Sequence, residues 1–368
     1  MLFSGSERPL FVPKGDDAFV RDAIQLFVHG NLRRALATIM LKLDHWLPRL
    51  HLLPTVKPTQ LPLPEIYGEL GISGDSFAVY YGSPGPLRKL TVYSSTADRS
   101  VTKIALQPSA DAMISNEGEI LALLANHRIG VDFVPRLLSH GQLSCGRHFV
   151  CTTVLPPGRR EPRFGAMHRA FLEELYAHRS CVTVWVHGRS YGTLVTHSAT
   201  IRRNLDRTNR ELFDSVLADI AALSGNEPVA ECVVHGDFAP WNISVSDERL
   251  WVFDWESAVT CGNPLHDFLH FHLIPDALLR RHLGHAELER LATHAGQHLA
   301  GLTGHALAPQ LVGALMLQYL TEIMIFFCAA DGELKHGHPV IRAYLRLLRT
   351  RHTWLPRMTS SGESDDER

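Results

Sequence analysis

Residues 233–256 read VVHGDFAPWNISVSDERLWVFDWE, and their pattern predicts the architecture of the chain. An apolar pair leads into a loop in which Asp237 and Asn242 are separated by four residues. Two short β-rich runs then flank the polar turn SDER at 246–249, which is typical of a hairpin. Because a hairpin returns the chain to nearly its starting point, we expect Asn242 before it and Asp254 after it to lie close together.

Oxygen-bearing side chains at these positions indicate a metal site. The oxygens of Asp and Asn are hard ligands, suited to magnesium held between a protein and the phosphates of a nucleotide. A metal on Asn242 and Asp254 would lie beside Asp237, whose carboxylate could accept the proton of an attacking hydroxyl. The residues therefore predict a magnesium-dependent transfer of a phosphoryl group from a nucleotide to an alcohol.

The complete pattern also resembles a known family. His-Gly-Asp-x-x-x-x-Asn followed by Asp-Trp-Glu is similar to the aminoglycoside phosphotransferase/choline kinase family, a branch of the protein-kinase-like fold. The loop resembles His-Arg-Asp-x-x-x-x-Asn of protein kinases, with Gly236 in place of Arg, and Asp-Trp-Glu stands where those have Asp-Phe-Gly. The resemblance implies an α+β, two-lobed protein-kinase-like fold, with a small β-rich N-lobe, a larger helical C-lobe and an N-terminal helical extension.

The resemblance, which covers roughly residues 67–354, also implies roles for single residues. Carried over by position, the catalytic base is Asp237 and the magnesium ligands are Asn242 and Asp254. His235 would be a structural member of the loop. In the run GNPLHD, Asp267 would brace the same loop.

The N-lobe is expected to hold the nucleotide. The turn GSPGP at 82–86 lies between two predicted strands, 77–81 and 89–94, where a kinase carries the loop that covers the phosphates. Small residues let backbone N–H groups approach phosphates. A Gly/Pro turn is also an ordinary hairpin connection, and this one departs from the protein-kinase glycine pattern. The candidate residues in the turn are Gly82, Ser83 and Gly85.

A strand lysine and a helix glutamate position the α- and β-phosphates in this fold. Lys103 lies on the predicted strand 101–106 and Glu117 opens the predicted helix 116–127. Lys89 and Glu119 are the rival residues for these two positions. Leu155, which ends the last predicted strand of the lobe, is the expected hinge residue beside adenine.

The domain boundaries follow changes in composition. Residues 1–64 combine a helical pattern with four prolines between positions 54 and 64, which forbid a helix and favour a connector. The nucleotide-binding N-lobe is predicted over 65–155 and the catalytic, substrate-binding C-lobe over 156–358. The tail 359–368, rich in Ser and acidic residues, is expected to be disordered.

Composition indicates a globular cytoplasmic protein. The 368 residues carry a formal net charge of −2, which argues against a nucleic-acid partner bound through a basic face. The six cysteines form no Cys-x-x-Cys pair and indicate reduced thiols. The N-terminus lacks the pattern of a signal peptide. Residues 311–330 are apolar enough for a membrane span, but Gln318, Tyr319, Thr321 and Glu322 near their centre favour a buried helix.

Several alternatives stay open from the sequence. A catalytically inactive, ATP-binding pseudokinase or interaction module would show the same fold, although such proteins typically lose a metal or base residue. A protein kinase is a second alternative, disfavoured by Gly236 and by the lack of an Ala-Pro-Glu segment after Asp254. A transition-metal site on His266, His270 and His272 is a third, because the first two would share a helix face.

The acceptor is predicted only as a class: a sugar, glycan, aminoglycoside-like compound or other small alcohol. Residues 276–357 contain more Arg and Lys than Asp and Glu, which disfavours a strongly cationic acceptor. The N-terminal helical segment combines apolar residues with Arg and Lys, so contact with a membrane surface is a further hypothesis. The oligomeric state is not predicted.

Overall fold

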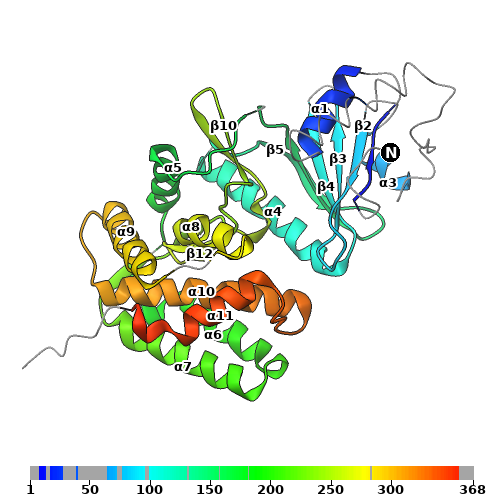
Figure 1. Ribbon diagram of the computed structural model, residues 1–368. Coiled ribbons are helices and arrows are strands. Elements are labelled where there is room, and N and C mark those ends of the chain that lie inside the picture. The colour runs from blue at the N-terminus through cyan, green and yellow to red at the C-terminus, as the bar shows by residue number, and fades with distance from the viewer. Residues whose placement is uncertain are drawn as a thin grey trace, which may run out of the picture. The chain divides into compact units, whose positions relative to one another are not determined.

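The computed structural model describes residues 8–13, 17–27, 39, 64–72, 77–95, 99–130, 132–156, 158–180, 182–281 and 284–355. The chain divides into two compact units, Met1–Pro156 and Pro157–Arg368 (Figure 1). The predicted tail 359–368 and nearly all of the proline-rich connector, as far as residue 63, lie outside the described residues. Most of the predicted helical pattern between residues 28 and 53 lies outside them as well.

The first unit is built on one antiparallel sheet of six strands, in the order β1-β2-β3-β4-β6-β5. The five strands predicted at 77–81, 89–94, 101–106, 136–140 and 148–154 are all present within one or two residues of their expected bounds. The strands are β1 (Leu10–Phe11), β2 (Phe77–Tyr81), β3 (Lys89–Ser94), β4 (Ser100–Ala105), β5 (Leu137–Gln142) and β6 (His148–Thr153). Strand β1 was not predicted, because two residues are too few to show a strand pattern.

Helices cover both faces of this sheet. Successive side chains of a strand point to opposite faces, and on β3 Tyr93 stacks on Phe19 while its neighbour Val92 packs in the same core cluster as Ile66. The helices that carry Phe19 and Ile66 therefore lie on opposite faces. The helices of this unit are α1 (Asp17–Phe27), α3 (Pro64–Glu69) and α4 (Pro108–His127).

Helix α4 begins eight residues before the predicted start at position 116. Pro108 occupies the first turn, where its fixed φ suits a helix and its missing N–H costs nothing. Ala110 and Ile114 are buried and extend the apolar face of the helix towards that proline. The sequence prediction missed this turn because its Ser and Asp residues are weak helix formers.

The second unit is mainly helical. Its α-helices are α5 (Ala166–Ala177), α6 (Arg189–Ile201), α7 (Arg207–Ser224), α8 (His266–Leu278), α9 (His285–Thr303), α10 (Pro309–Asp331) and α11 (Pro339–Arg349). Short 3-10 helices are η3 (Trp185–His187), η4 (Arg202–Asn204), η5 (Trp255–Ser257) and η6 (Arg351–Thr353).

Three two-stranded sheets accompany these helices, whereas the sequence predicted a single hairpin. The predicted hairpin is present as β10 (Ile243–Ser246) and β11 (Arg249–Val252). The other two pairs join strands that are far apart in sequence, so no local turn signal announces them. They are β7 (Val182–Val184) with β8 (Pro228–Ala230), and β9 (Cys232–Val234) with β12 (Val259–Gly262).

Helix α10 forms the core of the second unit. It is long and apolar enough to cross a membrane by length and composition, but 83% of its most apolar window is buried inside the protein. It packs against α6, α7, α8, α9 and α11. Gln318 and Tyr319 near its centre have no exposed surface and hydrogen-bond to other buried groups. This is the environment of a core helix of a globular unit.

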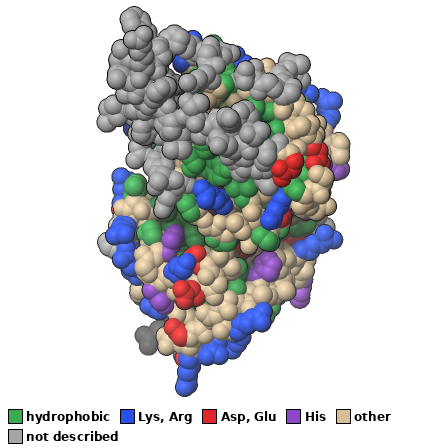
Figure 2. Space-filling view, turned by 90° about the vertical axis from the view of Figure 1, so that its right-hand side faces the viewer, with side chains coloured by type: hydrophobic (Ala, Val, Ile, Leu, Met, Phe, Trp, Pro, Cys, Tyr) green, Lys and Arg blue, Asp and Glu red, His purple; other side chains and the backbone are tan. Residues whose placement is uncertain are grey.

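The exposed surface agrees with the near-neutral net charge. On the face shown in Figure 2, acidic and basic side chains are interspersed, and several histidines reach the surface among them. The five described cysteines are free thiols, namely Cys145, Cys151, Cys232, Cys261 and Cys328.

A cluster of histidines and phenylalanines lies between helices α5, α8 and α9. The ring of Phe164 contacts His168, His272 and His298, and His298 also stacks on Phe268 at 4.7 Å between ring centroids. The Nε2 atoms of His168 and His298 are buried without a hydrogen-bond partner among the described residues. Burial lowers the pKa of His168, His272 and His298 to about 4 in each case.

We expect the protein to lose stability in mild acid because of this cluster. In the unfolded chain these rings titrate near pH 6.5, so below that pH the unfolded state binds protons that the folded state does not bind until about pH 4. The contribution of the three neutral histidines to folding stability is complete above pH 6.5 and decreases as the pH falls towards 4. At pH 5 the loss is about 2 kcal/mol per histidine, measurable by urea unfolding at pH 7.5 and pH 5.

The matched variant for this measurement is His298→Leu. Leucine removes a buried Nε2 atom that has no partner, so we expect stability at pH 7.5 to change little. The decrease in the free energy of unfolding between pH 7.5 and pH 5 should be about 2 kcal/mol smaller than in the wild type, because one of the three histidines no longer titrates. An unchanged pH dependence in this variant would contradict the assignment.

Candidate active site

In the first unit, a lysine and a glutamate form a close ion pair. Lys103 on β4 reaches Glu117 on α4, with Nζ 2.6 Å from Oε1 and 2.7 Å from Oε2. Glu117 is 2% exposed, and a buried carboxylate needs a charged partner of this kind. The rival Glu119 instead accepts a hydrogen bond from Ser115 on the exposed side of α4. The structure thus joins the two residues that the sequence favoured.

The predicted glycine turn is the exposed connection between β2 and β3. The amide of Gly82 donates to the carbonyl of Lys89 at 2.9 Å, which closes the hairpin, and Gly85 has a φ of +140°. Residues 83–86 of the turn are exposed. Leu155 follows β6 and immediately precedes Pro156, the last residue of the first unit. The structure thus gives the positions of these residues in the first unit, and their contacts with a nucleotide stay a prediction.

In the second unit, Asp267 fixes the backbone of the predicted catalytic loop. Its Oδ2 accepts from the amide of His235 at 2.7 Å and its Oδ1 from the amide of Gly236 at 2.9 Å. The side chain lies in the first turn of α8 and is 3% exposed. A buried carboxylate that receives two backbone N–H groups holds that backbone rigidly, which is the bracing arrangement expected from the sequence.

His235 joins the loop to the end of the hairpin. Its Nδ1 accepts from the amide of Asp237 at 3.2 Å, so Nε2 carries the proton and donates to the carbonyl of Phe253 at 3.1 Å. The edge of its ring contacts the indole of Trp255, with 4.7 Å between the ring centroids. The ring is fully buried. His235 therefore ties the segment with Asp237 to the residue directly before Asp254.

Gly236 has a left-handed backbone conformation, with a φ of +82°. A Cβ at this position would overlap the backbone carbonyl of Ser257, which cannot move aside as a flexible side chain could. This explains why the position where protein kinases carry Arg must be glycine in this chain.

We expect Gly236→Ala to destabilise the second unit by about 2–5 kcal/mol, from the left-handed backbone and the clash together. Urea unfolding measures this loss. The matched control is Gly192→Ala in α6, where an added Cβ meets nothing within 4 Å. There alanine should stabilise the helix by about 0.5–1 kcal/mol. Equal stabilities of the two variants would contradict the explanation.

The hairpin brings the start of β10 and the end of β11 together. Ile243 pairs with Val252, and the amide of Phe253 donates to the carbonyl of Asn242 at 3.1 Å. The Nδ2 of Asn242 donates to Oδ2 of Asp237 at 2.8 Å and to its carbonyl at 3.0 Å. The amide oxygen of Asn242 has no hydrogen bond among the described residues. It is therefore free to bind a cation.

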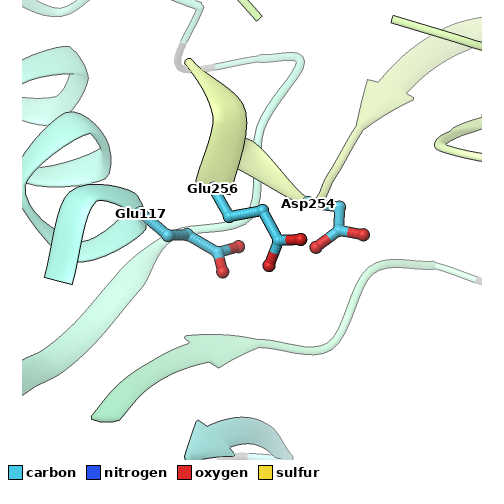
Figure 3. Close-up of side chains that lie close together, drawn as sticks. All are labelled: Glu117, Asp254 and Glu256. Carbon is cyan, nitrogen blue, oxygen red and sulfur yellow. The ribbon is translucent and has the colours of Figure 1, made fainter. Parts of the chain in front are cut away.

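Asp254 and Glu256 supply carboxylates at the end of the hairpin. Both follow β11, and an oxygen of one lies within 4.8 Å of an oxygen of the other (Figure 3). Asp254 has a φ of +73°, a region that Asp tolerates better than most residues. Strained backbone of this kind is common where a side chain must be aimed at a ligand. No role was predicted for Glu256 from the sequence; its spacing from Asp254 was the available signal.

Trp255 anchors this segment in the core. Its indole is fully buried, its Nε1 donates to the carbonyl of Val252 at 3.1 Å, and its ring contacts the edge of Phe171. The residues on either side of it are both half-buried. The apolar side chain therefore faces inward while the two carboxylates remain accessible.

Asp237 is held by two donors from different elements. In addition to Asn242, His270 on α8 lies with its Nε2 2.9 Å from Oδ1 of Asp237. The Asp237 side chain is 36% exposed, whereas that of His270 is 6% exposed. From the sequence, His270 was a candidate only for a metal ligand. Its spacing of three residues from Asp267 on one helix face was the signal for its contact with the loop.

The hypothesis of a transition metal on His266, His270 and His272 finds no support in this geometry. His266 uses Nδ1 for Glu322 at 2.8 Å and Nε2 for the carbonyl of Gly236 at 3.4 Å. Burial lowers its pKa, but the hydrogen bond and charge of Glu322 outweigh burial, and the pKa lies above the ordinary value. His272 faces the phenylalanine cluster.

Residues 87–307 match the family described as "APH: Phosphotransferase enzyme family", which is more than half of the chain. The chain belongs to this phosphotransferase family. It is therefore an enzyme, a kinase with an alcohol group as acceptor. No curated protein matches the chain.

Solved structures show that this phosphotransferase has the protein-kinase-like α+β fold. A thermostable variant of aminoglycoside phosphotransferase APH(4)-Ia, bound to ADP and hygromycin B, is 14% identical with a TM-score of 0.52, covering 78% of this chain and 97% of that one. APH(2'')-Ib bound to ADP is 19% identical with a TM-score of 0.51, covering 80% and 100%. APH(2'')-IIa with streptomycin and ATP is 17% identical with a TM-score of 0.51, covering 82% and 100%.

Proposed function

We propose that this phosphotransferase moves the γ-phosphoryl group of ATP to a hydroxyl of a small molecule, with magnesium as the cofactor. The observation that carries the proposal is the arrangement around Asp237 in the second unit. A half-exposed carboxylate is held by Asn242, whose own amide oxygen stays free, and the hairpin returns the chain to Asp254. Similar solved structures contain ADP or ATP together with hygromycin B or streptomycin, which supports ATP as donor and a small alcohol as acceptor.

Asp237 is the proposed catalytic base. Each of its carboxylate oxygens accepts one hydrogen bond, from His270 and from Asn242, so lone pairs on both remain available. The carboxylate can therefore accept a hydrogen bond from the hydroxyl of the acceptor, orient its oxygen and take its proton as the new P–O bond forms. The bond between the γ-phosphorus and the bridging oxygen breaks in the same transfer, leaving ADP.

Asn242 and Asp254 are the residues that would hold magnesium, and Glu256 is close enough to Asp254 to assist. Amide and carboxylate oxygens of this kind fit a hard divalent cation. When bound, the metal neutralises charge on the phosphates of the nucleotide. The chain's own contribution is to keep these oxygens aimed by the hairpin and by the buried Trp255.

In the first unit, Lys103 is the proposed ligand of the α- and β-phosphates. Glu117 holds its Nζ through both carboxylate oxygens, which limits the side chain to one orientation. Backbone groups of Gly82, Ser83 and Gly85 are proposed to cover the phosphates, and Leu155 to contact adenine. Most of the rate gain would come from positioning and electrostatics.

We further infer that the enzyme acts in the cytoplasm, because free thiols are typical of a reducing compartment. Contact with a membrane surface stays a hypothesis for the N-terminal segment. In its described part, the apolar residues Phe19, Val20, Ala23 and Ile24 of α1 are buried against the sheet of the first unit. Helix α1 therefore uses its apolar face inside the protein.

The experiment is an acceptor screen with the full chain. ADP release from Mg-ATP is measured with sugars, aminoglycosides, choline-like alcohols, lipid-linked glycans and a protein substrate, and products are identified by mass spectrometry. We expect one class of small alcohol to be phosphorylated, with loss of the reaction in EDTA. Binding of Mg-ATP without any transfer would favour the inactive pseudokinase, and phosphorylation of the protein substrate alone would favour a protein kinase.

A further inference from the structure

Three polar residues near the middle of helix α10, Gln318, Tyr319 and Glu322, have hydrogen-bond partners on other elements of the second unit. Burying polar groups in a helix this apolar is costly unless each has a partner. Gln318 bonds Trp185 and Glu322 at 2.7 Å each, and Glu322 bonds His266. Tyr319 meets His270 on α8. Tyr319 and Glu322 of α10 therefore form, with His270 and His266 of α8, a polar layer between the two helices.

Within this layer, a chain of hydrogen bonds leads to Asp237, and each group in it donates to the next one. An ionised carboxylate can only accept, so Nε2 of His270, at 2.9 Å from Asp237 Oδ1, must carry the proton. In a neutral ring Nδ1 then accepts, and the hydroxyl of Tyr319 lies 3.3 Å from it. The oxygen of Tyr319 in turn lies 2.8 Å from the hydroxyl of Tyr344 on α11. The chain runs from Tyr344 through Tyr319 and His270 to Asp237.

The protonation states agree with this direction. Burial lowers the pKa of His270, although its hydrogen bond and charge interaction with Asp237 offset part of the effect. The imidazole is therefore neutral at pH 7 and keeps one donor and one acceptor nitrogen. Burial also raises the pKa of Tyr319 and of Tyr344, so both hydroxyls keep their protons and can donate.

We propose that His270 is a positioning residue for Asp237 in phosphoryl transfer, and that the hydroxyl pair Tyr319–Tyr344 fixes the orientation of its ring; this inference rests on the proposed function. His270 is 4% exposed and contacts the carboxylate through Nε2 alone. It acts on the reaction through Asp237.

Two hydrogen-bond donors are needed to fix the carboxylate of Asp237, because with a single donor it can still rotate about its Cβ–Cγ bond. Asn242 holds Oδ2 from the hairpin side and His270 holds Oδ1 from helix α8. Without the second donor, rotation about the bond to the carboxylate would move the proton-accepting lone pairs away from the acceptor. A misplacement of about 1 Å at a reacting group can cost about 100-fold in rate.

The experiment compares variants of His270 with a matched control on the same helix, using Mg-ATP and water as the phosphoryl acceptor. His270→Leu should lower kcat about 100-fold while KM for ATP stays within about twofold. His270→Gln keeps an N–H donor in a similar place and should recover kcat to within about tenfold of wild type. Tyr319→Phe removes one neutral hydrogen bond and should cost about fivefold. The control His272→Leu removes a ring of α8 that faces the phenylalanine cluster, and should leave kcat unchanged.

A second measurement reads the hydrogen bond itself. Ring ¹H–¹⁵N spectra of the wild-type protein at pH 7 should show His270 protonated on Nε2 and unprotonated on Nδ1. The signal of the Nε2 proton should move upfield in Asp237→Ala, because it loses a charged partner. This readout decides the geometry even if His270→Leu fails to fold, as checked by thermal unfolding.

The outcomes separate this inference from the proposed function. A folded His270→Leu with wild-type kcat, a glutamine variant no better than leucine, or a proton on Nδ1 would each overturn the positioning role alone. A wild-type chain that neither hydrolyses Mg-ATP nor phosphorylates any alcohol would overturn the proposed function. The catalytic role of the contact between His270 and Asp237 would then fall with it. A KM effect without a kcat effect would also count against positioning.

Discussion

Replacing Asp237 by Asn is expected to lower the rate of phosphoryl transfer by about 10²–10⁴-fold, the usual contribution of a general base. The amide has nearly the same shape as the carboxylate but cannot take a proton from the acceptor. It also has a single acceptor oxygen, whereas Asn242 and His270 both donate to this position in the wild type. Either Nδ2 of Asn242 or Nε2 of His270 would therefore face the NH₂ group of the new side chain, which is also a donor.

The affinity for Mg-ATP should change little in this variant, because Asn242 and Asp254 keep their oxygens. Single-turnover transfer and calorimetric titration with Mg-ATP measure the two effects separately. The matched control is Asp247→Asn, the same substitution in the exposed turn between β10 and β11. Turnover in Asp237→Asn equal to that of the Asp247 variant would discard the assigned base.

Replacing Asp254 by Ala is expected to weaken both nucleotide binding and transfer. The variant removes a proposed magnesium ligand, and we expect Mg-ATP affinity to fall by about 10- to 100-fold or more, since even the partners of ligands contribute that much. Alanine also tolerates the left-handed backbone at this position less well than Asp, at a cost of about 1–2 kcal/mol in stability.

Asp254→Asn separates these two effects. Asparagine tolerates the same backbone and keeps one side-chain oxygen, so stability should be restored while magnesium binding stays impaired. Titrating magnesium at fixed ATP measures the metal effect, and a higher magnesium concentration should rescue part of the lost rate in Asp254→Asn. The same magnesium dependence in wild type and both variants would show that Asp254 is not a ligand.

Local sequence patterns were enough to predict the parts of the site that lie within one hairpin or one strand-helix unit. The polar turn between two β-rich runs required Asn242 and Asp254 to approach, and the observed register of β10 and β11 has this form. Lys103 and Glu117 are 14 residues apart, so a strand followed by a helix brings them together. The preference for Glu117 over Glu119 followed from the resemblance, and the ion pair agrees with it.

Contacts between distant segments could not be predicted in this way. The two amides held by Asp267 are more than 30 residues from it, and β7 pairs with a strand more than 40 residues away. No local pattern states which polar group will meet which, because that choice depends on how helices and strands pack. For the same reason the histidines of α8 could be interpreted as metal ligands until their hydrogen-bond partners were known.

Residue types and short spacings were sufficient to predict the fold class, the family and the charged residues of the proposed centre. The contacts that hold Asp237 depend instead on how distant segments pack. The donor His270 comes from α8, its ring is fixed by Tyr319 from α10, and that hydroxyl is fixed by Tyr344 from α11. Three helices meet there because their apolar faces pack together, and packing is a property of the whole unit.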